Sequence, residues 1–176
     1  PLALDQAVAF LAQACEALAE AHALGIVHRD LKPANLFLAR RGGREICLKV
    51  LDFGISKLGG TDGSITSTKS VLGSPYYMSP EQMRSARSVD ARSDVWSLGV
   101  VLYELLTARL PFVGDTLPEI CVAVTQSEPE LLARVRADLP AAVQAAVHRC
   151  LAKNRAERCA SVAELAAMIA PFGPPS

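Results

Sequence analysis

Four polar side chains in two short stretches have the types and spacing that phosphoryl transfer requires. Asp30, Lys32 and Asn35 lie close together in the chain, and Asp52 follows a short apolar run. A carboxylate such as Asp30 can accept the proton of an attacking hydroxyl, and a nearby ammonium group can neutralise charge on the transferred phosphate. The oxygens of Asn35 and Asp52 are hard ligands, which suit Mg²⁺ when phosphates and water complete its coordination. These residues therefore indicate metal-assisted phosphoryl transfer.

The alternative explanation is that Asp30 and Asp52 are ordinary loop carboxylates, and a single HRD tripeptide would favour it. Longer motifs argue against this alternative, because they all occur in one order along the chain. HRDLKPAN occupies residues 28–35, DFG occupies 52–54, SPE occupies 79–81 and DVWSLG occupies 94–99. Together they resemble the catalytic loop, the magnesium-binding motif, the end of the activation segment and a buried helix start of protein kinases.

The resemblance is to the protein kinase family, and within it to the bacterial eukaryotic-like Ser/Thr protein kinases. It implies that Asp30 is the catalytic base and that Lys32 contacts the phosphates of ATP. It also implies that Asn35 and Asp52 hold Mg²⁺, so ATP and Mg²⁺ are the expected cofactors. In this family Lys32 accompanies protein substrates with Ser/Thr acceptors. By family position Phe37 forms the apolar floor beneath adenine, although as a strand residue it could equally belong to the core.

The same resemblance suggests regulation by phosphorylation of the loop between DFG and SPE. Arg29 precedes the catalytic base, and with Lys57 it could bind a loop phosphate through charge-assisted hydrogen bonds. Thr66 and Thr68 are the candidate phosphorylation sites, and the alternative is a merely flexible polar loop. Ser74 takes the place of the substrate-docking Ser or Thr, whose hydroxyl can bridge the catalytic base and its neighbouring lysine.

Other motif residues are predicted to have structural roles. Glu81 is expected to pair with Arg158. His28 should hydrogen-bond to the backbone next to the DFG motif, with Phe53 packed behind it. Asp94 is expected to cap its own helix and to hold the backbone at the start of the catalytic loop.

The composition indicates one globular domain, since 51% of the 176 residues are hydrophobic and the formal net charge is zero. Scattered basic residues and zero net charge give no electrostatic indication of nucleic-acid binding. No apolar run is long enough to cross a bilayer, so no membrane segment is expected in this chain. The five cysteines form no C-x-x-C pair. We expect reduced, mostly buried thiols in a cytoplasmic protein, or in the cytoplasmic part of a larger one.

Apolar periodicity locates the elements that must position these residues. Helices are predicted at 4–24, 94–106, 117–126, 140–151 and 161–169, and short strands at 26–27, 36–38 and 46–50. The hairpin of the last two strands would place Asn35 and Asp52 at neighbouring strand ends. The helix from Asp94 should be central and buried, because it is apolar nearly all round. With the resemblance, this implies an α+β, protein-kinase-like fold: a mainly helical large lobe with short β-hairpins at the catalytic cleft.

The motifs that clamp ATP from above in a protein kinase do not occur in this sequence. It contains no GxGxxG, and no VAIK-like run precedes His28. The resemblance therefore covers the C-terminal lobe of a protein kinase catalytic domain, residues 1–172, with the start of a linker at 173–176 and the small lobe absent. The chain begins with Pro, which suggests a fragment or a processed product that lacks its N-terminal kinase lobe.

Two functions follow as hypotheses. In the first, the chain is a fragment of a Ser/Thr protein kinase that transfers the γ-phosphate of ATP, and the isolated fragment has little or no activity. In the second, it is a non-catalytic kinase-lobe binding module, which a degraded HRD, DFG or metal-binding Asn would have favoured. A small-molecule phosphotransferase is a weaker alternative, because it would lack the segment from DFG to SPE.

Overall fold

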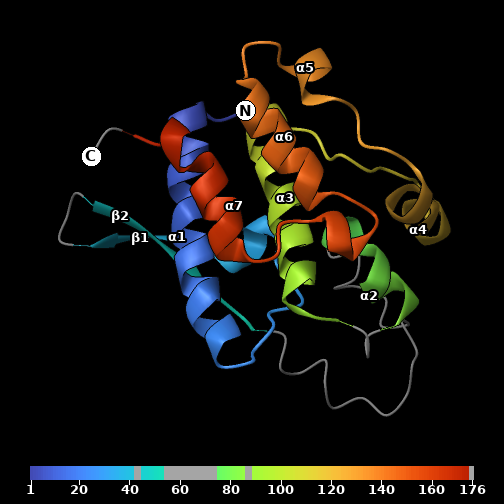
Figure 1. The fold of residues 1–176 in the computed structure, drawn as a ribbon, viewed down its shortest axis with the longest axis horizontal. Helices are drawn as coiled ribbons and strands as arrows, with labels where there is room; N and C mark the ends of the chain where they lie inside the picture. Colours follow the sequence, from blue (N-terminus) through green and yellow to red (C-terminus); the bar gives the residue numbers. More distant parts are fainter. Residues whose placement is uncertain (42–44, 54–74, 86–88, 175–176) are drawn as a thin grey trace.

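The computed structural model describes residues 1–41, 45–53, 75–85 and 89–174, apart from the side chains of Arg41 and Glu45. This part of the chain is mostly helical and contains one two-stranded antiparallel sheet (Figure 1). The helices are α1 (Leu4–Ala23), α2 (Pro80–Arg84), α3 (Ala91–Thr107), α4 (Leu117–Gln126), α5 (Leu132–Val135), α6 (Ala141–Cys150) and α7 (Val162–Ile169). The strands are β1 (Leu36–Arg41) and β2 (Glu45–Val50), and short 3-10 helices are η1 (Pro33–Asn35), η3 (Pro75–Tyr77), η5 (Arg155–Glu157) and η6 (Ala170–Phe172).

Helix α3 is the centre of the core, as its apolar sequence predicts. Most of its residues are buried, including Trp96, and it packs against α1, α6 and α7. It begins at Ala91, and the side chain of Asp90 caps it by accepting a hydrogen bond from the Arg92 amide at 2.9 Å. The prediction that Asp94 caps this helix is therefore wrong. Asp94 lies inside the first turn, and its carboxylate is fully buried.

Helix α1 confirms the prediction of a helix over 4–24 to within one residue. Its buried face carries apolar side chains at helical spacing, among them Leu11 and Leu18. The chain leaves the helix through Gly25, whose φ of 74° is one that glycine adopts without a steric penalty. The strand predicted at 26–27 is not observed. The Ile26 amide instead donates to the carbonyl of Ala21 at 2.9 Å, so this segment turns back onto the end of α1.

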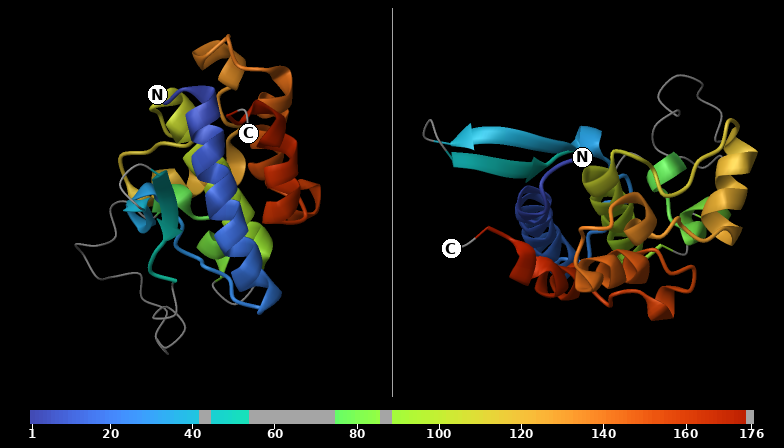
Figure 2. Two further views of the ribbon diagram at one scale, coloured as in Figure 1. Left: turned by 90° about the vertical axis from the view of Figure 1, so that its left-hand side faces the viewer. Right: turned by 90° about the horizontal axis from the view of Figure 1, so that it is seen from above.

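The two strands confirm the predicted hairpin and extend it beyond Leu38. Leu36 lies opposite Val50 in the antiparallel register. The hairpin packs on α1, where the side chain of Gln13 accepts a hydrogen bond from the Leu48 amide at 2.8 Å. Seen from above in Figure 2, α1 lies between this hairpin and α7. Phe37 is 56% exposed, which excludes the alternative that it is an ordinary core residue.

The later helices α4, α6 and α7 confirm the predictions to within one residue at each end. Helices α2 and α5 were not predicted, because each is at most five residues long and shows no periodicity. Among the described residues, no helix combines the length and the hydropathy that a membrane span requires.

Candidate active site

Three of the predicted site residues converge in residues 28–35, between α1 and β1, which we call the catalytic loop after its predicted role. The Nζ of Lys32 lies 3.1 Å from Oδ2 of Asp30. The side-chain amide of Asn35 donates to the backbone carbonyl of Asp30 at 2.7 Å and lies 3.4 Å from Oδ2 of the same residue. Pro33 starts the short 3-10 helix η1, which turns Asn35 back toward Asp30. The loop therefore holds a carboxylate, an ammonium group and an amide within hydrogen-bonding distance of one another.

Asp52 is placed next to this loop by the hairpin. The amide of Leu51 donates to the backbone carbonyl of Asn35 at 2.9 Å, one step beyond the last strand pair. Asn35 and Asp52 therefore leave the hairpin at the same end, as the sequence predicts. Asp52 is exposed and has a φ of 53°, a left-handed conformation in which Asp is enriched relative to most other residues.

His28 has the structural role that was predicted for it. It is fully buried, and its Nδ1 accepts a hydrogen bond from the Asp30 amide at 3.2 Å. Its Nε2 therefore carries the proton and donates to the carbonyl of Leu51 at 2.9 Å. The ring of Phe53 packs against the imidazole, with ring centroids 4.7 Å apart. His28 thus ties the catalytic loop to the chain that leads into the DFG motif.

The buried carboxylate of Asp94 holds the start of the catalytic loop, which confirms the second half of its prediction. It accepts hydrogen bonds from the amides of His28 at 2.8 Å and Arg29 at 2.9 Å. The φ of Arg29 is 67°, so these bonds stabilise a strained backbone. Asp94 also contacts Nε2 of His22 at 2.8 Å. The sequence did not indicate this contact of His22, because its partner lies on a distant helix.

A second buried carboxylate, Glu81 of α2, pairs with Arg158 as predicted. Two guanidinium nitrogens of Arg158 lie 2.7 and 2.9 Å from the carboxylate oxygens of Glu81, and the Ser93 hydroxyl donates to this carboxylate at 2.6 Å. Burial alone would raise the pKa of Glu81, but the hydrogen bonds from Arg158 and Ser93 hold it below its usual value. In the same short helix, the side-chain amide of Gln82 donates to the backbone carbonyl of Arg29 at 2.8 Å. Helix α2 is thereby fixed both to the core and to the catalytic loop.

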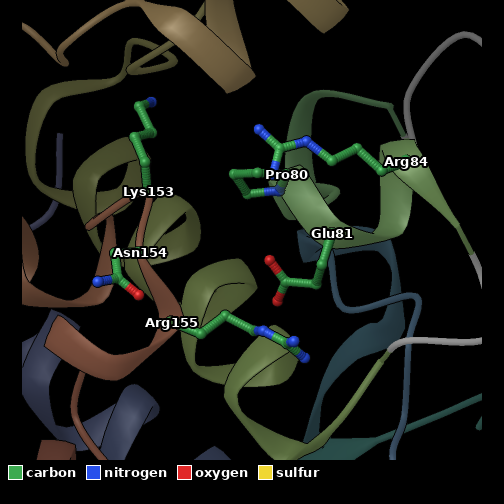
Figure 3. A pocket seen from close by; sticks show the side chains of 6 residues that line it. All are labelled: Pro80, Glu81, Arg84, Lys153, Asn154 and Arg155. Carbon is green, nitrogen blue, oxygen red and sulfur yellow. The ribbon is translucent and has the colours of Figure 1, made fainter.

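Glu81 also lines a pocket of about 250 Å³ (Figure 3). Its lining residues are Pro80, Glu81, Arg84, Lys153, Asn154 and Arg155. Lys153 directs its ammonium group at the ring of Phe112, 3.8 Å from the centroid, and burial lowers the pKa of Lys153 to about 8.

A second, apolar cavity of about 180 Å³ lies between α1, the hairpin and α3. Neither cavity is lined by the polar residues of the catalytic loop.

Several predicted residues fall where the structure gives no account of them. Lys57, Thr66, Thr68 and Ser74 lie outside the described residues, so their roles stay predictions. Arg29 is described, and its Nε is buried without a hydrogen-bond partner among the described residues.

Known proteins that are similar to this chain are protein kinases. Residues 1–168 match the family model of the protein kinase domain. The chain is 46% identical over 163 residues to serine/threonine-protein kinase Pkn1 of Myxococcus xanthus, covering 93% of this chain and 23% of the relative. It is 42% identical over 168 residues to serine/threonine-protein kinase PknB of Mycolicibacterium smegmatis, covering 95% of this chain and 26% of the relative. The chain thus spans about a quarter of the length of these relatives. It belongs to the protein kinase family, with the bacterial eukaryotic-like Ser/Thr kinases as its relatives.

Proposed function

We propose that this chain is the C-terminal lobe of a Ser/Thr protein kinase, which transfers the γ-phosphate of ATP to protein Ser/Thr hydroxyls. Residues 1–172 would form the lobe, and 173–176 would begin a linker. The observation that carries the proposal is the convergence of Lys32 and Asn35 on the carboxylate of Asp30, at 3.1 and 3.4 Å. A solvated structural loop does not require this arrangement, whereas transfer from ATP to a hydroxyl does.

Asp30 would act as the base that accepts the proton of the acceptor hydroxyl. Its side chain is 17% exposed, so it is close to solvent yet held in place by the loop. The amide of Asn35 and the ammonium group of Lys32 both orient this carboxylate. Lys32 is itself 21% exposed, so it could also reach a transferred phosphate and neutralise its charge.

Asn35 and Asp52 fit the ligand preferences of Mg²⁺. The amide nitrogen of Asn35 is used on Asp30, which leaves its amide oxygen as the atom for a cation. The Asp52 carboxylate is exposed at the same end of the hairpin. When bound, Mg²⁺ would neutralise charge on the phosphate oxygens of ATP. Phe37, exposed on the hairpin, would support adenine, and the glycine-rich loop and strand lysine would come from an N-terminal kinase lobe outside these 176 residues.

Regulation by phosphorylation is part of this proposal. The buried Nε of Arg29 would meet a phosphate on Thr66 or Thr68, with Lys57 as a second donor. Ser74 would dock the substrate beside the catalytic loop. Mass spectrometry of protein isolated from active cells should find phosphate on this loop, and a loop that stays unmodified in active enzyme would refute the regulatory part.

The decisive experiment is Asp30→Asn in the longest protein that contains this chain. We expect kcat for a protein substrate to fall by about 10²–10⁴-fold, because the base is lost while size and hydrogen bonding are nearly kept. Asp138→Asn is the matched control, since the Asp138 side chain is 68% exposed and forms its ion pair with Arg136, which is not a residue of the catalytic loop. Equal activity of the Asp30→Asn protein, with its fold intact by circular dichroism, would refute the role of Asp30 as the base. A wild-type protein without kinase activity would favour the binding-module alternative.

The 176 residues alone are expected to transfer little or no phosphate, because the glycine-rich loop and the strand lysine do not occur in them. Steady turnover by this chain that Asp30→Asn abolishes would contradict the assignment as one lobe. We also place the reaction in the cytoplasm, because all five cysteines are free thiols, which suits a reducing compartment.

A further inference from the structure

Two cysteines that the phosphotransfer chemistry does not use lie in contact at the end of α6. Cys150 is the last residue of α6, and Cys159 lies between η5 and α7. Their sulfur atoms are 3.9 Å apart, and both side chains are fully buried. The thioether of Met168 lies 3.7 Å from the sulfur of Cys159. The sequence predicts buried, reduced thiols, but it does not predict that these two meet.

The two thiols differ in how firmly the fold holds them. A Cβ atom added at Gly99 would lie 2.5 Å from the Cβ of Cys150, so α6 presses closely against α3 at this point. Cys150 therefore has little room to move. Cys159 belongs to an irregular connection, and its neighbour Ala160 is exposed. A disulfide needs a sulfur–sulfur distance of about 2.05 Å, so the pair must approach by about 1.9 Å. Because Cys159 lies in this irregular connection, it is the residue that can move toward its partner.

The two thiols also differ in acidity. A hydrogen bond from Cys150 and the positive charge of Arg149 lower the pKa of Cys159. The same hydrogen bond, together with burial, raises the pKa of Cys150. These influences favour the thiolate at Cys159 over the thiolate at Cys150. A thiolate beside a protonated thiol is the arrangement of an attacking and a resolving cysteine.

We propose that Cys150 and Cys159 form an oxidation site, which a hydroperoxide converts into a reversible intramolecular disulfide. The Cys159 thiolate attacks the terminal oxygen of the hydroperoxide and breaks the O–O bond, which gives a sulfenic acid. The leaving alkoxide, or hydroxide from hydrogen peroxide, takes up the proton that Cys159 lost and departs as an alcohol or as water. The Cys150 sulfur then attacks the sulfur of Cys159, and the hydroxyl group of the sulfenic acid leaves as water with the thiol proton of Cys150. Two thiols lose two electrons, and one peroxide gains them.

The proposed disulfide would close a covalent ring over residues 150–159. This ring contains Arg158, which holds α2 in place through Glu81. Within this ring, Arg158 binds both oxygens of Glu81 and donates to the carbonyl of Ala152 at 2.8 Å. A disulfide between the two ends of this segment restricts the conformations that the segment can adopt. Oxidation would therefore stiffen the segment that supports Glu81, without touching the residues of the catalytic loop.

Trypsin can test this site directly, because it separates all five cysteines. It cleaves after Arg149, Lys153 and Arg158, so the disulfide would join peptide 150–153 to the peptide that begins at Cys159. Cys15, Cys47 and Cys121 fall in three other peptides. Reduced, purified protein is treated with increasing hydrogen peroxide, alkylated under denaturing conditions, digested and analysed by mass spectrometry without reductant.

We expect loss of two of the five thiols, a monomer lighter by two hydrogen atoms, and a 150–153 peptide linked to the Cys159 peptide. Dithiothreitol should reverse the change, and Cys159→Ser should abolish it. Cys121→Ser is the control, because Cys121 is a partly exposed thiol on α4, and it should leave the cross-link unchanged. Hydrogen exchange of amides 151–158 should slow on oxidation.

Three results would overturn the proposal. One is that the partly exposed Cys47 and Cys121 oxidise while the 150–153 and Cys159 peptides stay alkylated. Another is a cross-link of Cys159 to Cys15 or to a second molecule. The third is conversion of Cys159 to a sulfinic acid while Cys150 stays free. Because Cys159→Ser could disturb packing, the wild-type peptide map decides between these outcomes without any variant.

Discussion

Replacing Arg158 by Met removes the only guanidinium that binds both oxygens of Glu81 in the described part of the chain. Arg158 is fully buried and the Glu81 side chain is 8% exposed, so water cannot replace the lost partner. Loss of one member of a buried ion pair costs about 3–5 kcal/mol, because an uncompensated charge remains. That is a large fraction of the about 5–15 kcal/mol that stabilises a typical domain.

Equilibrium unfolding in urea measures this cost. With an m-value of about 2 kcal/mol/M, a loss of about 4 kcal/mol lowers the midpoint by about 2 M. Arg149→Met is a matched control, because Arg149 also forms an ion pair at 2.7 Å, with Glu164, but the two side chains are 44% and 35% exposed. The control should cost less than about 1 kcal/mol. Similar losses for both variants would refute the argument that burial makes the Glu81 pair important.

The same pair predicts a dependence on pH. Because its partners lower the pKa of Glu81 in the folded protein, its contribution to stability is complete above the unfolded value of about 4.5. That contribution is lost as pH falls through the lower, folded pKa. The difference in unfolding free energy between wild type and Arg158→Met should therefore shrink below pH 4.5. A difference that stays constant from pH 7 to the acid limit would contradict this account.

Substitutions at three further positions test the supports around the site by urea unfolding. Asp94→Ala should cost about 2–6 kcal/mol, since two loop amides lose their acceptor, and Asp94→Asn, which keeps one oxygen acceptor, should cost less. Gly99→Ala should cost about 1–3 kcal/mol, because the new Cβ would lie 2.5 Å from Cys150, and an unchanged midpoint would contradict the close packing of α3 and α6. Tyr77→Phe should cost about 1–2 kcal/mol, since the Tyr77 hydroxyl donates to Glu104 at 2.7 Å.

The catalytic loop was predictable because its residues are close in sequence. Asp30, Lys32 and Asn35 occupy one short loop, so their proximity needs no knowledge of the fold. The hairpin added Asp52, because two short apolar runs around a Gly-containing turn indicate two paired strands. The pairing of Glu81 with Arg158 is different. The two lie far apart in the chain, and only the resemblance to a known family indicated that they meet.

Other features depend on three-dimensional contacts that local patterns do not encode. Two acidic residues, Asp90 and Asp94, stand near the start of α3, and either could cap it by sequence alone. The structure uses the first as the cap and the second as a buried acceptor. The contact between His22 and Asp94 joins two helices, so no periodicity predicts it. The apolar pair at 26–27 has the composition of a strand, yet the Ile26 amide donates a hydrogen bond to the Ala21 carbonyl at the end of α1.

The polar residues of α3 explain how one buried helix can position two separate segments of the site. Ser93 donates to Glu81 of α2, while Asp94 accepts from the first amides of the catalytic loop. One turn later the Ser97 hydroxyl donates to the carbonyl of Tyr77 at 2.8 Å. Polar side chains in the core are costly unless they are hydrogen-bonded, and each of these is bonded to a segment outside its own helix. Ser93, Asp94 and Ser97 therefore mark where this apolar helix supports the site, whereas its apolar positions maintain the packing of the core.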